Sequence, residues 1–329
     1  MHTHTDPRRA YAAPLVTGAL FLTAAFLLAA CTGGGAPMRD GSSPPPAASG
    51  QSGQQAPPSR RQRVPLYSER FNAESPFDPA AGVRIAANNG PVEIVPGAGD
   101  TLRVHATVSA ASPSRLEHTR VRLEPDAEGV LRVGVDWPSG REPAEASAFR
   151  IEAPVGARVT DVDAGNAAVR IVDMAGDVRI ITTRGDVEVL NHRGHIHAET
   201  TYARVTVRDP GGNVYAKSEN GVITVHNAPG RVRAVTANAG VDVRLSSHNP
   251  GPVHIESSLG AIHLEIGEGF VGELDLHSVS GSLDIPAALS EHIVSRGRER
   301  ATLRFGEGGE RSTVRTTGAA IRVRPTGTR

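Results

Sequence analysis

The sequence predicts an all-β fold, a two-sheet parallel β-solenoid, and three repeating features lead to this prediction. From about residue 165, a pair of apolar residues separated by one position recurs every nine residues. A glycine stands two residues before most pairs, and two kinds of turn alternate every eighteen residues. Self-similarity at a short fixed period is typical of stacked repeat architectures. The pairs are Val169/Ile171, Val178/Ile180, Val187/Val189, Ile196/Ala198, Val205/Val207, Val214/Ala216, Ile223/Val225, Val232/Ala234 and Val241/Val243.

Each nine-residue unit is interpreted as one short strand followed by one tight turn. The apolar–polar–apolar centre, as in Val205-Thr206-Val207, alternates like a strand with one buried face. β-Branched residues dominate these centres, as expected on a pleated, half-buried surface. The residues between them are rich in Gly, Asn, Asp, Pro and Ser, which favour turns.

The alternation of turns sets the number of strands in each rung of the stack. One kind of turn falls at residues 182–185, 200–203, 218–221 and 236–239, and the other at 191–194, 209–212 and 227–230. Ala203 and Ala239 replace glycine in the first series. This pattern predicts two strands per eighteen-residue rung, one in each of two facing sheets, with rungs about 4.8 Å apart. An antiparallel β meander or sandwich of nine-residue units is the alternative.

The N-terminus predicts export and a lipid anchor. Residues 1–30 combine Arg8 and Arg9 with an apolar run, which is typical of a secretory signal peptide. The run ends in Leu-Ala-Ala before Cys31, the single cysteine, and so resembles a bacterial lipoprotein signal in which that cysteine is lipidated. Thr32 follows instead of the aspartate of inner-membrane retention signals. We therefore expect a membrane-anchored lipoprotein in the outer membrane of a Gram-negative envelope.

The rest of the chain is expected to have four parts. Residues 31–63 are a tether, because their Gly, Pro, Ser and Gln content cannot bury enough apolar surface to fold. Residues 64–166 form an N-terminal β cap, with strands expected near 102–108, 116–123, 130–135 and 149–153. Residues 167–289 form the repeat β-solenoid, with three- to four-residue insertions bulging at two turns. Residues 290–329 supply closing strands, at 301–305 and 312–323, and a tail.

The region from about Val83 to Val323 also resembles a known family. The resemblance is carried by Val83-Arg84-Ile85, by Asn89-Gly90-Pro91-Val92-Glu93-Ile94, by the Gly-x-Val-x-Val units and by Ser278-Val279-Ser280-Gly281-Ser282-Leu283. In their order and spacing these motifs are similar to the bacterial adhesin-like β-strand-repeat domain of unknown function, described as an auto-transporter adhesin head (GIN domain-like). The resemblance implies a solenoid-like fold on an envelope protein and supplies no catalytic residues.

Outward-facing side chains supply the candidate binding face. With eighteen-residue rungs, one sheet carries two external columns, whereas the facing sheet carries a mixed column. The columns of the first sheet are Arg179, His197, Tyr215 and Arg233, and Asp177, His195, Asn213 and Arg231; the facing column is Arg170, Glu188, Thr206, Thr224 and Asp242. Arginine forks bind carboxylate and phosphate groups well. We single out Arg179, His197, Tyr215, Arg231 and Arg233 as the candidate binding face for an anionic envelope polymer or partner.

Metal binding and catalysis are weaker alternatives. Asp177, His195 and His197 would lie close enough on adjacent rungs to be considered as metal ligands. The turns lack the regular aspartates of a calcium β-roll. Carbohydrate-cleaving chemistry needs two carboxylates close together, and no acidic residue of the regular rungs has another acid eighteen positions away.

The resulting functional prediction is a non-catalytic, lipid-anchored envelope scaffold or adhesin-like binding surface without a cofactor. Its expected partners are the membrane, through the lipid, and an envelope polysaccharide or protein. A formal net charge of zero argues against nucleic acid. The alternatives are a polysaccharide-acting β-helix enzyme and a weak metal-binding envelope sensor.

Overall fold

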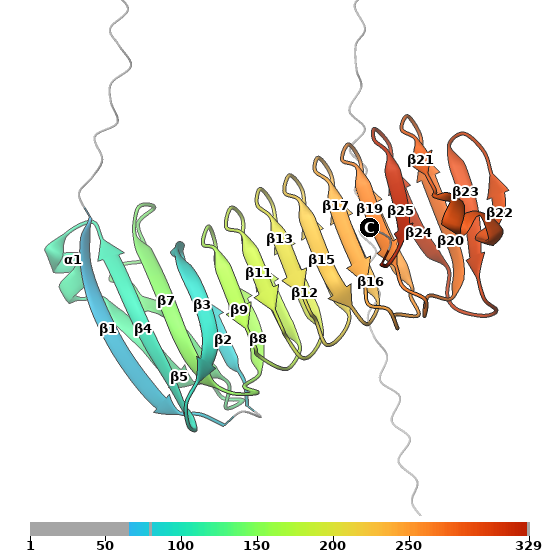
Figure 1. The fold of residues 1–329 in the computed structure, drawn as a ribbon. Helices are drawn as coiled ribbons and strands as arrows, with labels where there is room; N and C mark the ends of the chain where they lie inside the picture. The colour runs from blue at the N-terminus through green and yellow to red at the C-terminus, as the bar shows by residue number, and fades with distance from the viewer. Residues whose placement is uncertain (1–65, 79–80, 328–329) are drawn as a thin grey trace, which may run out of the picture. The chain divides into compact units, whose positions relative to one another are not determined.

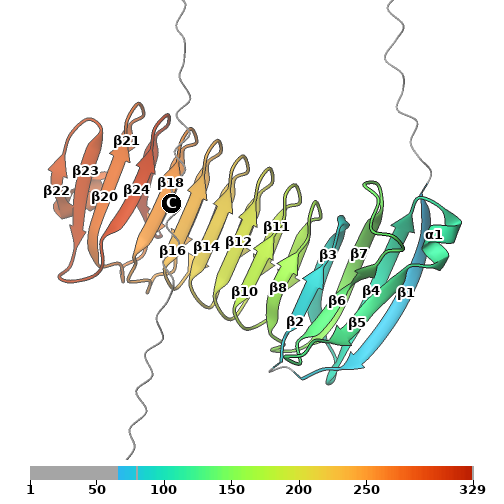
Figure 2. The same ribbon diagram turned by 180° about the vertical axis from the view of Figure 1, so that it is seen from behind.

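The computed structural model describes residues 66–78 and 81–327, and they form two facing β-sheets with a continuous shared core (Figures 1 and 2). One sheet has 12 strands and the other 13, and most neighbouring strands are parallel. The predicted fold class, a two-sheet parallel β-solenoid, is confirmed. The signal peptide, Cys31 and the whole of the predicted tether, residues 31–63, lie outside the described residues.

We call the 12-stranded sheet sheet A. In spatial order it contains β1 (Tyr67–Pro76), β4 (Thr101–Ala110), β7 (Ala146–Pro154), β3 (Asn89–Gly97), β9 (Val169–Val172), β11 (Val187–Leu190), β13 (Val205–Arg208), β15 (Ile223–Ala228), β17 (Val241–Leu245), β19 (Ile262–Ile266), β25 (Ile321–Pro325) and β21 (Leu283–Asp284).

The 13-stranded sheet is sheet B. In spatial order it contains β22 (Ile293–Arg296), β23 (Arg300–Phe305), β20 (Gly272–Ser278), β24 (Ser312–Thr316), β18 (Val253–Ser257), β16 (Val232–Thr236), β14 (Val214–Ser218), β12 (Ile196–Thr200), β10 (Val178–Ile181), β8 (Val159–Asp163), β2 (Val83–Ala86), β6 (Leu131–Asp136) and β5 (Arg120–Pro125). Two short helices complete the described fold, α1 (Pro113–Glu117) and the 3-10 helix η1 (Ala287–His292).

The register follows the eighteen-residue period. In sheet B, Val178 lies beside Ile196 and Ile196 beside Val214, while in sheet A Val187 lies beside Val205, all in parallel pairs. This parallel ladder rules out the antiparallel meander for the repeats. Antiparallel pairs occur near the two ends, where β1, β4 and β5 cover one end and β22 and β23 cover the other.

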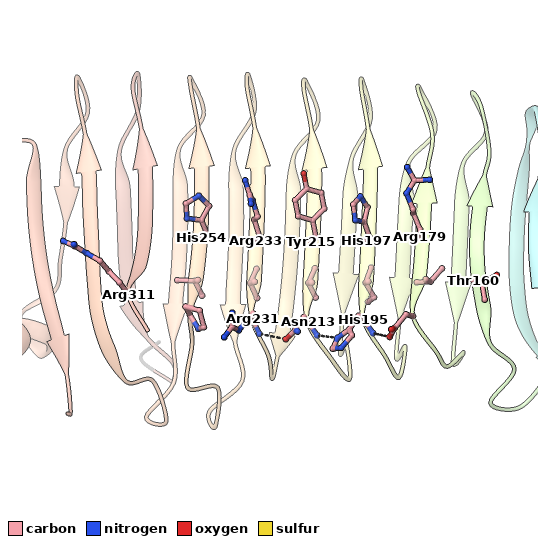
Figure 3. Close-up of a pocket in the computed structure, with 17 residues that line it drawn as sticks. Thr160, Arg179, His195, His197, Asn213, Tyr215, Arg231, Arg233, His254 and Arg311 are labelled. Carbon is pink, nitrogen blue, oxygen red and sulfur yellow. Dashed lines mark hydrogen bonds between the residues drawn. The ribbon is translucent and has the colours of Figure 1, made fainter. Parts of the chain in front are cut away.

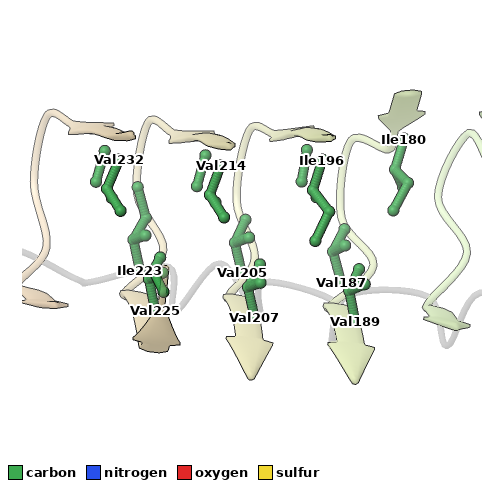
Figure 4. Packing of buried hydrophobic residues seen from close by; sticks show 14 of the residues in the cluster. Ile180, Val187, Val189, Ile196, Val205, Val207, Val214, Ile223, Val225 and Val232 are labelled. Atoms are coloured by element: carbon green, nitrogen blue, oxygen red, sulfur yellow. The ribbon is translucent and has the colours of Figure 1, made fainter. Parts of the chain in front are cut away.

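The apolar pairs of both sheets point into a narrow shared interior (Figure 4). Ile180, Val189 and Val205, for example, have no exposed surface. Burying a side chain of this kind stabilises the fold by about 1.5–3 kcal/mol. Because the rungs of the repeat present similar small aliphatic side chains to one another, the core is continuous along the stack.

A ladder of buried hydroxyl groups stabilises the first kind of turn, the one at residues 182–185, 200–203, 218–221 and 236–239. Ser218 Oγ donates to the carbonyl of Ala203 in the adjacent rung (3.0 Å) and accepts from the N–H of Gly221 in its own turn (2.8 Å). The equivalent hydroxyls belong to Thr182, Thr200, Thr236, Ser257, Thr316 and Ser278. The hydroxyls therefore satisfy buried backbone groups that would otherwise lack partners.

Glycine and alanine alternate from rung to rung at the end of this turn. A Cβ added to Gly221 would lie 1.6 Å from the carbonyl oxygen of Ala203, whereas the next rung has room for the methyl group of Ala239. The spatial order of the column is Ala167, Gly185, Ala203, Gly221, Ala239, Gly260, Ala319 and Gly281. The two alanines that interrupt the sequence series thus reflect a regular two-rung alternation of backbone contacts.

The second kind of turn depends on a left-handed backbone. The four residues Asp173, Asn191, Asp209 and Asn227 are spaced eighteen apart and have φ between 51° and 56°. Asp and Asn tolerate this conformation better than other side-chain-bearing residues. The following residue points inward, and His192 is fully buried there, with Nε2 donating to the Gly176 carbonyl (2.6 Å). Burial lowers the pKa of His192.

Both ends of the stack depart from sequence order. The sequence analysis expected residues 312–323 to close the C-terminal end of the stack. The strands formed there, β24 and β25, do not close it. They lie between the rung of β18 and β19 and the rung of β20 and β21. At the other end, β2 and β3 lie between β6 and β7 on one side and β8 and β9 on the other. Each inserted rung has the inward apolar pattern of its neighbours, so the register continues through it.

The expected strand at residues 116–123 is wrong in its first part. Residues Pro113–Glu117 form α1, because Ser112 caps the helix by accepting from Arg115 N–H (3.2 Å) and a proline occupies its first turn. Arg115 also forms a two-point ion pair with buried Glu145 (2.6 and 2.9 Å). That hydrogen-bonded pair lowers the pKa of Glu145 despite the opposing effect of burial.

Candidate binding groove

A shallow groove of about 650 Å³ crosses the outer face of sheet B (Figure 3). It runs across β10, β12, β14, β16 and β18, and two rows of side chains border it. The upper row is Arg179, His197, Tyr215, Arg233 and His254, and the lower row is Asp177, His195, Asn213 and Arg231. Between the rows, the inward-pointing residues Val178, Ile196, Val214, Val232 and Val253 leave a floor of backbone.

The register of sheet B brings the candidate face together. Arg179 lies beside His197, His197 beside Tyr215, and Tyr215 beside Arg233. Arg231 immediately precedes β16, the strand that contains Arg233, and completes the lower row. All five residues of the candidate face therefore line one groove.

Ring contacts order the middle of the upper row. The rings of His197 and Tyr215 lie 4.5 Å apart, and the Arg233 guanidinium lies 5.7 Å from the Tyr215 ring centre on the other side. A cation over an aromatic face is attracted by the ring quadrupole. The three side chains therefore form a continuous row along the stack, in which the His197 and Tyr215 rings are tilted by 36° to one another.

The lower row is held by hydrogen bonds from side chains to backbone. Asp177 Oδ1 accepts from the N–H of His195, His195 Nδ1 accepts from that of Asn213, and Asn213 Oδ1 accepts from that of Arg231, each at 3.0 Å. The sequence did not reveal this ladder, since only stacking places each acceptor under the next N–H. Because His195 Nδ1 accepts a hydrogen bond, that nitrogen carries no proton.

The suggested metal ligands are engaged elsewhere. Asp177 and His195 bind backbone, and His197 Nε2 lies 2.5 Å from Glu199 Oε1. Within residues 66–78 and 81–327, no three His, Cys, Asp or Glu side chains are grouped so as to hold a metal ion.

The groove is basic. Its lining includes four arginines and a single carboxylate, that of Asp177. Arg179 lies 3.8 Å from Asp161, and Arg231 pairs with Glu310 at the rim. Arg233 has no carboxylate within 4.0 Å in the described part of the chain and is exposed. An anion entering the groove would meet cations that the protein only partly neutralises.

The outer face of sheet A carries a second groove, of about 760 Å³, in which the charges compensate one another. Glu93 pairs with Arg150 (2.5 Å) and Arg170 (3.3 Å), and Arg170 also pairs with Glu188 (2.9 Å). Cations that are already paired with carboxylates in this way offer little to an anionic ligand. The lining of the sheet A groove thus contains three arginines and three carboxylates, whereas that of the sheet B groove contains four arginines and one carboxylate.

Sequence reasoning missed two basic residues of the groove on sheet B. His254 extends the upper row, but it lies twenty-one residues after Arg233 because a turn insertion interrupts the period. Arg311 borders the groove beside β18 because β24 is inserted there. The insertion at residues 248–250 was a visible signal for the first, whereas no local signal marked the second.

Comparisons with known proteins do not assign this chain to a family. No protein-family model and no curated protein matches the sequence. A crystal structure that matches is that of a protein described as a "putative cell adhesion protein" from Clostridium sporogenes ATCC 15579, with 8% sequence identity and a TM-score of 0.25. The match covers 78% of this chain and 100% of that one. Membership of the adhesin-like family stays a prediction.

In the described residues, neither helix has the length and hydrophobicity needed for a membrane span.

Proposed function

We propose that this protein is a lipid-anchored, non-catalytic envelope protein that binds a linear anionic polysaccharide along the groove of sheet B. One observation carries the proposal: basic and aromatic side chains repeat along the stack in a groove whose cations are incompletely paired. The anchor rests on the signal sequence and Cys31.

The form of the groove suits an extended polymer. Its two rows run perpendicular to the strands, so equivalent positions recur at the inter-strand spacing of about 4.8 Å. A chain of repeating units can therefore make similar contacts with successive rungs. Arginine side chains recognise carboxylate and sulfate groups through paired N–H donors, and the neighbouring rings of His197 and Tyr215 offer apolar contact to a sugar unit.

The lining supports binding without hydrolysis. Hydrolysis of a glycosidic bond ordinarily uses two carboxyl groups on either side of the bond. Asp177 is the carboxylate of the groove lining, and its Oδ1 already accepts the N–H of His195. The described groove therefore contains no pair of carboxyl groups suited to that reaction.

Binding can be tested with polygalacturonate as the probe and the full chain purified in detergent. We expect Arg179→Gln/Arg233→Gln to weaken binding about tenfold, because an exposed charge pair contributes up to about 1 kcal/mol. The matched control is Arg204→Gln/Arg208→Gln, which removes two exposed arginines from the outer side of sheet A. Equal losses in both variants would show non-specific charge attraction, and an unchanged affinity in the groove variant would refute the site.

The anchor needs a separate test. Palmitate labelling and globomycin sensitivity in a Gram-negative host should both disappear in Cys31→Ala, while the groove of the variant should bind polygalacturonate as before. Outer-membrane fractionation of the labelled protein then tests the proposed location. Labelling that persists without Cys31 would contradict lipidation at this residue.

A further inference from the structure

A second group of basic side chains lies on the outer face of sheet B, beyond the groove. Arg315 of β24, His277 of β20 and Arg300 of β23 are neighbours in register, because Arg315 lies beside His277 and His277 beside Arg300. They line a cavity of about 450 Å³ together with Arg311, Asp275 and Thr302. Arg311 also borders the first groove, so the two depressions adjoin.

This group exists because the C-terminal rung is inserted into the stack. Arg315 follows His277 by thirty-eight residues in sequence but lies on the adjacent strand. Without the insertion of β24, β20 would lie beside β18, and Arg311 and Arg315 would be absent from this face. The inserted rung therefore both joins the two depressions and supplies two of the three arginines of the second one.

The charge of the second group is only partly compensated. Asp275 accepts hydrogen bonds from Arg311 and from Thr302 Oγ1 (2.9 Å). Burial opposes the ionisation of Asp275, but these bonds and the nearby arginines lower its pKa, so it stays ionised and is committed to Arg311. Arg300 and Arg315 are exposed and have no carboxylate within 4.0 Å among the described residues.

We propose that Arg300, Arg315 and His277 form a second anion-binding site, which holds a carboxylate or sulfate group of the same linear polysaccharide. The inference rests on the proposed function and adds a length requirement to it. From Arg179 on β10 to Arg300 on β23 the face spans eight strands, or about 34 Å at the inter-strand spacing. A chain long enough to reach both depressions binds more tightly than a short one, because its second contact is intramolecular.

The test uses size-fractionated polygalacturonate and the full chain in detergent. The short probe has about four units and cannot extend from Arg179 to Arg300, and the long probe has about twelve. The unmodified protein should bind the long probe at least about tenfold more tightly per molecule than the short one. Arg300→Gln/Arg315→Gln should remove most of this advantage and leave the affinity for the short probe within about twofold.

The control variant carries its substitutions on sheet A, away from both depressions. Arg204→Gln/Arg208→Gln should leave the advantage of the long probe intact, and far-UV circular dichroism should show each variant folded. If Arg300→Gln/Arg315→Gln binds the long probe like the unmodified protein, the second site is refuted while the groove stands. If the unmodified protein binds neither probe, the proposed function fails and the second site fails with it.

Discussion

Substitution of Gly221 by alanine tests the packing of the turns most directly. The added methyl group would lie 1.6 Å from the Ala203 carbonyl oxygen and 2.2 Å from its carbon. Both are backbone atoms, so no side chain can rotate to make room. The two rungs would have to separate by about 1.5 Å at this turn to restore an ordinary contact.

The cost can be estimated from the bonds that this separation breaks. Ser218 Oγ would lose the Ala203 carbonyl (3.0 Å) and Asn220 N–H would lose the Thr201 carbonyl (2.9 Å). At about 1 kcal/mol for each bond and about 1–3 kcal/mol for overpacking, Gly221→Ala should lower the free energy of unfolding by about 3–5 kcal/mol. Gly221 has no positive φ, so the cost is steric and not conformational.

Urea unfolding of the full chain, followed by far-UV circular dichroism, measures this change. The matched control is Ala203→Gly, the opposite exchange one rung away, which should cost only about 0.5–1 kcal/mol through backbone entropy. The double variant should be no more stable than Gly221→Ala, because the clash involves the Ala203 carbonyl and not its methyl group. A loss below about 1 kcal/mol for Gly221→Ala would refute the close approach of the rungs.

Three further predictions concern the two kinds of turn. Ser218→Ala leaves the Gly221 N–H and the Ala203 carbonyl without their partner and should cost about 2–3 kcal/mol in urea unfolding, whereas Ser218→Thr should be tolerated; equal effects would contradict the hydroxyl ladder. Because burial lowers the pKa of His192, the unfolded state takes up a proton first, so stability should fall as the pH drops below about 6.5. His192→Met should flatten that decline, and an unchanged slope would assign it to other groups. Asn191→Val should lower the thermal midpoint because Asn191 has φ of 52°, and Asn191→Gly should cost far less; similar losses would argue against backbone strain.

The regular part of this protein was predictable from local sequence. Apolar pairs such as Val205/Val207 identify the strands, and the two alternating turns identify two strands per rung. A shift of the register by one residue would turn all the pairs outward, so the fixed period favours stacking of equivalent positions. The columns of Arg179, Tyr215 and Arg233 then follow without any further information, which is why the candidate face could be named in advance.

The sequence alone determined the strands, the two-sheet solenoid and the residues of its basic face, because each of these depends on neighbours nine or eighteen positions away. The tertiary structure alone decided which rungs are adjacent at the two ends. The inserted rung of β24 and β25 has the same inward pattern as every other rung, so its position depends on long-range contacts and on the strands that cover the ends. Arg300, Arg311 and Arg315 line one depression only because the rung of β24 and β25 is inserted there.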